Sequence, residues 1–232
     1  MGKILNIETS TRVCSVCLSD SFRILSSREK PDTIEHAKIL HPFIEDVLSG
    51  AGLGFTDLDA VAVSEGPGSY TGLRIGVSAA KGICYAHSLP LIAVNTLQSM
   101  AMHAIEECDN PKALYIPMID ARRMEVYMAV FNAKGEMIEP VKAEIIKGSS
   151  FQNYADYQTV YYFGDGAEKC REILAGRPML NFHAGGMPSA IYMNQLSQKK
   201  LNDKAFTDAA YFEPFYLKDF IAGKPKVKGL NI

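Results

Sequence analysis

The chain has 232 residues, of which 24 are basic, 26 are acidic and 47% are hydrophobic, and its formal net charge is −2. This composition is typical of a globular protein and excludes a disordered chain, a collagen-like repeat and a uniformly basic polyanion binder. The longest stretch without a charged side chain, residues 82–105, contains a proline and several polar residues, so we expect no membrane span. Five cysteines without framework spacing, and an N-terminus without a signal-like apolar run, favour the cytoplasm.

The first half of the chain predicts strands and helices in alternation. Two strands, over residues 3–7 and 13–18, flank a polar turn at 8–11. The elements expected after them are a helix at 33–49, a strand at 58–63, a helix at 70–86, a strand at 89–94 and a helix at 97–107.

The first two expected helices differ in their apolar pattern. The helix at 33–49, for which Thr33 is a candidate cap, has one apolar stripe formed by Ile34, Ala37, Leu40, Ile44, Val47 and Leu48. Ile39 and Phe43 lie off this stripe and are left without a core position. The helix at 70–86 is apolar nearly all round, with Arg74 and Lys81 on one side, which indicates burial on more than one face.

The opening pattern returns in the second half. Residues 114–119, 120–123 and 126–131 again predict strand, polar turn and strand, and a shift of 112 residues places Ile7-Glu8 on Ile119-Asp120. The rest predicts a strand near 159–163, a turn at 164–166, helices near 168–174 and 187–196, and a basic tail from Lys218 that we expect to be solvated. A single match of this kind is a weak sign of duplication.

Two loops could hold a phosphate. Glycines at 66–72 lie between a strand and a helix start, where backbone N–H groups and the helix dipole favour an anion, and hydroxyls in the 8–11 turn could assist. The loop is neither a Walker A motif nor G-x-G-x-x-G, and the alternative is a tight turn that packs the helix on the sheet. The candidate nucleotide-binding residues are Thr9, Ser10, Thr11, Gly66, Gly68 and Ser69. The glycine turn at 164–166 is equally ambiguous.

The sequence indicates no metal site and no catalytic residue. Cys14 and Cys17 spell C-x-x-C within an expected strand, where their side chains point to opposite faces and cannot chelate or form a disulfide. His36 and His41 are five residues apart on an expected helix and cannot share one metal ion.

Four segments carry a specific resemblance. They are ILNIETS at 4–10, EGPGSYTGLRIG at 65–76, DAR at 120–122 and PFYLK at 214–218. These segments resemble the TsaB (YeaZ) family, a partner protein in bacterial tRNA threonylcarbamoyladenosine synthesis, over nearly the whole chain. The resemblance implies an α/β chain with the actin-like or Hsp70-like ATPase fold, whose two related lobes are ribonuclease H-like. We expect an N-terminal lobe at 1–108, a smaller lobe at 109–218 and a basic, flexible tail at 219–232.

The same resemblance implies a chain without catalytic residues. The family is related to TsaD, the catalytic subunit that transfers a threonylcarbamoyl group to N6 of the adenosine following the anticodon. Thr96 and Met100 stand where TsaD has metal-binding histidines, and a hydroxyl and a thioether do not replace them. We therefore expect no metal and no cofactor of its own, with ATP or ADP bound at most weakly or at the interface of a complex.

Partners are also implied by the resemblance. The family uses its first two helices to form a homodimer and to bind TsaD directly; TsaE joins the complex and tRNA is contacted indirectly. The interface residues expected here are His36, Ile39, Leu40, Phe43, Val47, Tyr70, Leu73, Arg74 and Val77. The alternatives are an ATP-dependent small-molecule kinase-like enzyme and a metallopeptidase-like protein of the same superfamily.

Overall fold

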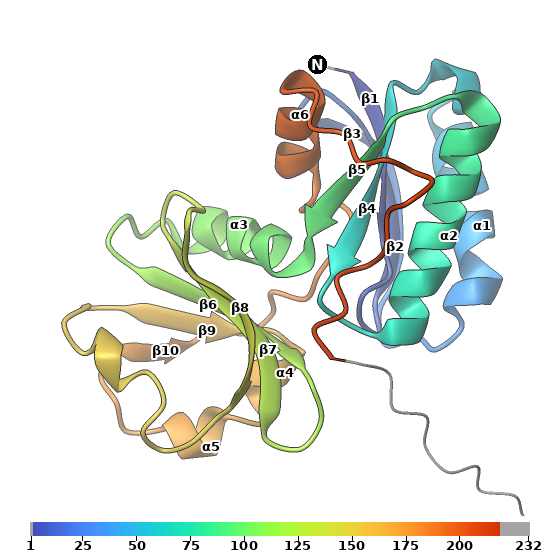
Figure 1. The fold of residues 1–232 in the computed structure, drawn as a ribbon. Helices are drawn as coiled ribbons and strands as arrows, with labels where there is room; N and C mark the ends of the chain where they lie inside the picture. The colour runs from blue at the N-terminus through green and yellow to red at the C-terminus, as the bar shows by residue number, and fades with distance from the viewer. Residues whose placement is uncertain (1, 219–232) are drawn as a thin grey trace, which may run out of the picture.

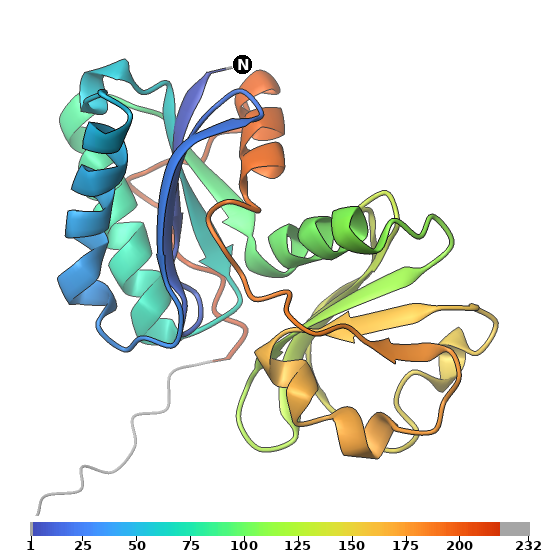
Figure 2. The same ribbon diagram turned by 180° about the vertical axis from the view of Figure 1, so that it is seen from behind.

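Two five-stranded sheets, one in each of two lobes, organise the chain in the computed structural model, which describes residues 2–218 (Figures 1 and 2). The first sheet has the order β3-β2-β1-β4-β5, with strands β1 (Lys3–Glu8), β2 (Cys14–Asp20), β3 (Arg23–Lys30), β4 (Ala60–Gly66) and β5 (Leu91–Asn95). Strands β1, β2 and β3 are antiparallel neighbours, whereas β1, β4 and β5 run parallel.

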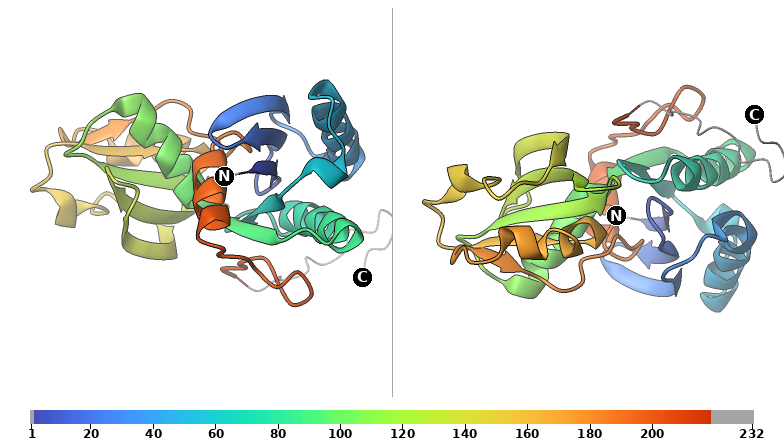
Figure 3. Two further views of the ribbon diagram at one scale, coloured as in Figure 1. Left: turned by 90° about the horizontal axis from the view of Figure 1, so that it is seen from above. Right: turned by 90° about the horizontal axis from the view of Figure 1, so that it is seen from below.

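Helices cover both faces of the first sheet. On one face lie α1 (His36–Gly50) and α2 (Tyr70–His87), with the short 3-10 turn η1 (Phe55–Asp57) between them in sequence. On the other face lies α6 (Asn194–Asn202), far from these helices in the chain (Figure 3). Cys14 packs in the core between the sheet and helices α1 and α2, and Cys17 packs in the core on the face covered by α6. This confirms that the C-x-x-C pair points to opposite faces of the sheet.

The second sheet has the order β10-β9-β6-β7-β8. Its strands are β6 (Leu114–Asp120), β7 (Glu125–Asn132), β8 (Met137–Ile145), β9 (Val160–Phe163) and β10 (Leu180–Phe182). Helix α3 (Thr96–Cys108) covers one face, and the other is covered by η2 (Gln152–Tyr154), α4 (Asp165–Glu168) and α5 (Arg171–Leu174).

The two lobes share one topology. In each, two antiparallel hairpins are followed by two strands that run parallel to the first strand. Strand β1 ends at Glu8 and β6 ends at Asp120, the two residues that the 112-residue shift superposes. The internal repeat predicted from the sequence is therefore confirmed.

Several elements differ from the prediction. Strands β3 and β8 lie outside the prediction: both are edge strands without a fully buried residue, and hairpin pairing with β2 and β7 holds them. The three-residue β10 is too short to leave a pattern. The helix expected at 187–196 begins only at Asn194, and the helix expected at 168–174 is replaced by the short helices α4 and α5.

Helix α1 begins later than the sequence predicts. Thr33 does not cap it; the Thr33 hydroxyl instead accepts a hydrogen bond from the Glu35 N–H at 3.1 Å, and the helix starts at His36. Ile34 consequently precedes the helix and is 83% exposed, although its place in the apolar stripe predicted burial.

The chain returns to the first lobe before it ends, so the second lobe is shorter than the expected span of 109–218. Ala190 and Met193 pack against the far face of the first sheet, and the Ala190 N–H donates to the Ser15 hydroxyl at 2.7 Å. Gln198 on α6 binds both backbone groups of Gly2. The expected tail at 219–232 lies outside the described residues. Among residues 2–218, no helix has the length and apolar character needed to cross a membrane.

Candidate protein-docking groove

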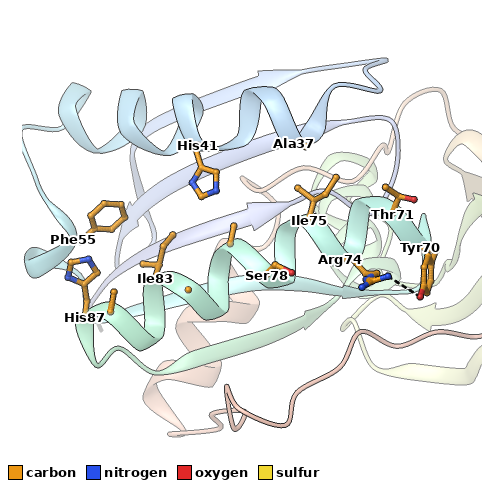
Figure 4. A pocket seen from close by; sticks show the side chains of 13 residues that line it. Ala37, His41, Phe55, Tyr70, Thr71, Arg74, Ile75, Ser78, Ile83 and His87 are labelled. Atoms are coloured by element: carbon orange, nitrogen blue, oxygen red, sulfur yellow. Dashed lines mark hydrogen bonds between the residues drawn. The ribbon is translucent and has the colours of Figure 1, made fainter.

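Helices α1 and α2 leave an open groove between them on the outer side of the first lobe (Figure 4). Its volume is about 670 Å³. It is lined by Ala37 and His41 of α1, by Phe55, and by Tyr70, Thr71, Arg74, Ile75, Ser78, Ala79, Gly82, Ile83, Ala86 and His87. These side chains are mostly apolar, and no aspartate or glutamate is among them.

Small residues on α2 create the groove. Ser78, Gly82 and Ala86 follow one another at four-residue intervals, so they lie on one face of the helix, and all three are exposed. A Cβ added at Gly82 would meet no atom within 4 Å. The helix therefore presents a shallow backbone surface against which a partner could pack closely.

Aromatic and cationic side chains mark the two ends of the groove. At one end Phe55 stacks on His87, with ring centroids 4.9 Å apart. At the other end the Arg74 guanidinium lies 5.4 Å from the centroid of the Tyr70 ring and donates to the Tyr70 hydroxyl at 3.3 Å. The groove thus combines an apolar floor with Arg74 and two histidines, a lining suited to a partner with apolar and acidic side chains.

The residues expected at the interface separate into three groups. Leu40, Val47, Leu73 and Val77 are at most 4% exposed and belong to the core of the lobe, and His36 is buried with its Nε2 3.3 Å from the Val13 carbonyl oxygen. Ile39 and Phe43 are half-buried against the same core. Of the nine, Tyr70 and Arg74 line the groove.

This distribution corrects the expected interface. The sequence argument selected the large apolar side chains of α1 and α2, but those are the side chains that the sheet needs for its own core. The exposed residues of α2 are instead Thr71, Arg74, Ser78, Gly82, Ala86, His87 and Tyr85, the last of which is 90% exposed. The sequence signal of this exposed face is the repeat of Ser78, Gly82 and Ala86, because small residues at that spacing do not fill a core.

The glycine loop packs closely against the 8–11 turn. The Ser69 N–H donates to the Ser10 carbonyl oxygen at 2.6 Å, and the Thr9 hydroxyl donates to the Gly72 carbonyl oxygen at 2.8 Å. A Cβ added at Gly68 or Gly72 would lie less than 3.0 Å from the carbonyl oxygen of Ser10 or Thr9. These glycines therefore permit close packing, as the tight-turn alternative predicted.

The other candidate nucleotide-binding residues are used in the same way. Thr9, Ser10 and Thr11 are buried, and the Thr11 hydroxyl accepts from the Val13 N–H at 3.2 Å. Gly66 lies with its Cα beside the Phe215 carbonyl oxygen, and the Ser69 hydroxyl caps α2 by accepting from the Gly72 N–H at 3.2 Å. Apart from the Ser10 hydroxyl, the polar groups named here are engaged within the chain, and no step through a nucleotide is derived for this chain.

Glu8 is a fully buried carboxyl at the end of β1. Its Oε1 accepts from the Ser10 N–H at 2.6 Å, whereas Glu8 Oε2 and the Ser10 hydroxyl have no hydrogen-bond partner among residues 2–218. Burial raises the pKa of the Glu8 carboxyl above its ordinary value of 4.5, and hydrogen bonds from Ser10 oppose the shift. The folded protein therefore holds the Glu8 proton more tightly than the unfolded chain does.

Thr96 and Met100, the two positions at which the resemblance implies lost metal ligands, serve packing. Thr96 and Met100 begin α3 and are both fully buried, and Met100 packs in the core between α3 and the second sheet. Within residues 2–218, no group of three His, Cys, Asp or Glu side chains is placed to hold a metal ion. A metal ion does not fit the residues that occupy this position.

The duplicated sheets and their helices define the class of this protein, the actin-like ATPase fold. Component A of the (R)-2-hydroxyglutaryl-CoA dehydratase of Acidaminococcus fermentans shares that fold, with a TM-score of 0.51 at 10% identity over 87% of this chain and 100% of that chain.

More similar proteins narrow the class. The family model of TsaD, tRNA N6-adenosine threonylcarbamoyltransferase, matches residues 30–195. The tRNA threonylcarbamoyladenosine biosynthesis protein TsaB of Haemophilus influenzae is 30% identical over 95% of this chain and 95% of its own. The structure of YeaZ from Pseudomonas aeruginosa matches with a TM-score of 0.77 at 29% identity, over 94% of this chain and 100% of that chain. The chain belongs to the TsaB (YeaZ) family, which is related to the TsaD transferases.

Proposed function

We propose that this chain is a non-catalytic subunit in the synthesis of tRNA N6-threonylcarbamoyladenosine and that it docks TsaD through the groove between α1 and α2. The observation that carries the proposal is the groove itself, an exposed apolar surface on the lobe whose glycine loop is closed by its own backbone. Relatives named for this biosynthesis supply the process. In this proposal the chain acts by binding, through the groove.

The kinship with TsaD supports the choice of partner. The TsaD family model spans α1 and α2 of this chain, so a TsaD subunit carries helices in the same places. A face that packs against its equivalent on a second copy can also pack against the equivalent face of a related subunit. The homodimer and the TsaD complex then compete for one groove.

The remaining assignments follow from this role. TsaE joins through the complex, tRNA is contacted indirectly, and the chain works in the cytoplasm. ATP or ADP belongs to the interface of the complex, since backbone atoms of this chain occupy the space beside the Cα atoms of Gly68 and Gly72. No observation in the described residues favours the kinase-like or the metallopeptidase-like alternative.

A single substitution tests the groove. Gly82→Glu places a charged side chain on its floor without a clash, and replacing glycine within a helix favours folding by up to about 1 kcal/mol. We expect Gly82→Glu to abolish TsaD binding and self-association while the unfolding midpoint in urea stays at or above that of wild type. Gly148→Glu is the matched control, because Gly148 lies outside the groove and also has no atom within 4 Å of an added Cβ.

Activity is measured as threonylcarbamoylation of tRNA by TsaD, TsaE, the adenylate-forming enzyme and ATP, with and without this chain. We expect modification to require the wild-type or Gly148→Glu chain and to fail with Gly82→Glu. Equal modification without the chain, or with Gly82→Glu, would contradict the proposal.

A further inference from the structure

The last described segment, residues 205–218, forms a strap along α2 (Figure 1). The strap begins after α6 and is anchored where the Thr207 N–H donates to the Leu91 carbonyl oxygen at 2.8 Å. Lys81 of α2 then donates to the carbonyl oxygens of Ala210 and Phe212 at 3.1 and 3.2 Å. The strap therefore runs beside α2 toward the end at which this helix begins.

At that end the strap contacts the wall of the groove. The Phe215 N–H donates to the Glu65 carbonyl oxygen at 2.7 Å, which fixes the strap on the end of β4. The next residue, Tyr216, packs its ring against Tyr70 with centroids 4.8 Å apart. Tyr70 in turn holds Arg74 by a hydrogen bond and a cation–π contact. A side chain of the strap thus contacts one groove residue, which in turn contacts a second.

Two residues later the strap reaches the second lobe. Lys218 forms an ion pair with Glu125, the first residue of β7. Glu125 belongs to the lobe opposite the groove, and the Glu125 carbonyl oxygen also accepts from Lys169 at 2.7 Å. The strap is therefore attached to both lobes within a few residues.

We propose that the strap couples docking in the groove to the attachment of the second lobe. Tyr216 is a positioning residue that holds Tyr70 and Arg74 in the conformation a partner meets, and the ion pair between Lys218 and Glu125 holds Tyr216 in place. The inference rests on the proposed function of the groove and adds a control of that site.

The expected effect is moderate. Without the ring of Tyr216, the Tyr70 and Arg74 side chains gain rotamer freedom that docking must remove again, and ordering side chains of this kind weakens binding by about three- to tenfold. Loss of the ion pair acts on the groove through Tyr216 only. Its effect on docking should therefore vanish once Tyr216 is absent.

The test measures the affinity of the full chain for a TsaD subunit by calorimetry. We expect Tyr216→Ala to weaken binding about three- to tenfold, Tyr216→Phe to restore it, and Glu125→Gln to weaken it less. In the double variant, Glu125→Gln should add nothing to Tyr216→Ala. Lys218→Met repeats the ion-pair test from the other side, and urea unfolding identifies any variant that has lost its fold.

Tyr211→Ala is the matched control for the strap, since Tyr211 lies on it and is 85% exposed. Wild-type affinity in Tyr216→Ala and Glu125→Gln, or additive losses in the double variant, would overturn the inference. If Gly82→Glu abolishes binding in the same series, the proposed function stands while the strap inference falls. If Gly82→Glu also binds normally, the groove is not the docking site and both are refuted.

Discussion

Replacing Gly72 with alanine tests whether the glycine loop is a packing device. A Cβ at this position would lie less than 3.0 Å from the Thr9 carbonyl oxygen, a backbone atom that cannot turn aside. The added methyl group would also strain the hydrogen bond that the Thr9 hydroxyl donates to the Gly72 carbonyl oxygen.

Three contributions determine the change in the free energy of unfolding, two destabilising and one stabilising. Overpacking of this kind costs about 1–3 kcal/mol, and the strained hydrogen bond is worth about 1 kcal/mol. Alanine favours the helix over glycine by up to about 1 kcal/mol. We expect Gly72→Ala to lower the free energy of unfolding by about 2 kcal/mol overall.

Gly82→Ala is the control in the same helix. No atom lies within 4 Å of a Cβ added there, so only the helix preference acts and the free energy of unfolding should rise by up to about 1 kcal/mol. The assay is urea unfolding followed by circular dichroism at one protein concentration, because self-association adds stability by mass action. Equal stability of Gly72→Ala and wild type would refute the packing argument.

Two further substitutions test buried positions. Glu8→Gln should raise the free energy of unfolding at pH 7 by about 1 kcal/mol, because burial disfavours the ionised carboxyl and the Glu8 Oε2 has no partner in the described part of the chain. Since burial raises the Glu8 pKa, the gain should shrink as the pH falls and should be lost well below 4.5, where the wild-type carboxyl is neutral in both states; a gain independent of pH would contradict this. Thr96→His combined with Met100→His should lower the midpoint of unfolding in urea without creating zinc-dependent stabilisation, because both side chains are fully buried.

The two lobes use glycine in the same way at equivalent places. In the first lobe Gly68 and Gly72 lie against the end of the hairpin formed by β1 and β2, and in the second lobe Gly164 and Gly166 lie against Met118 and Ile119 at the end of β6. Duplication thus kept the close packing of helix on strand in both halves. Each of the two glycine turns that the sequence offered as phosphate loops packs closely on the end of a strand in its own lobe.

Local patterns in the sequence were sufficient for much of the fold. The repeated strand, turn and strand, the helix beginning at Tyr70 and the burial of Cys14 and Cys17 on opposite faces depend on residues a few positions apart. Edge strand β3 was missed because exposed polar residues form a strand only when a neighbour pairs with them.

The tertiary structure alone decided which surfaces are free. Gly72 packs against Thr9, which lies 63 residues earlier in the chain, and no local pattern predicts such a contact. From the sequence, large apolar residues such as Leu40 and Leu73 could belong either to a core or to an interface. In the folded lobe both side chains are buried in the core. The groove lies between two helices that are separated in sequence, and Gly82 on its floor is left uncovered. Such an open surface depends on how the whole lobe packs, so no local pattern in the sequence predicts it.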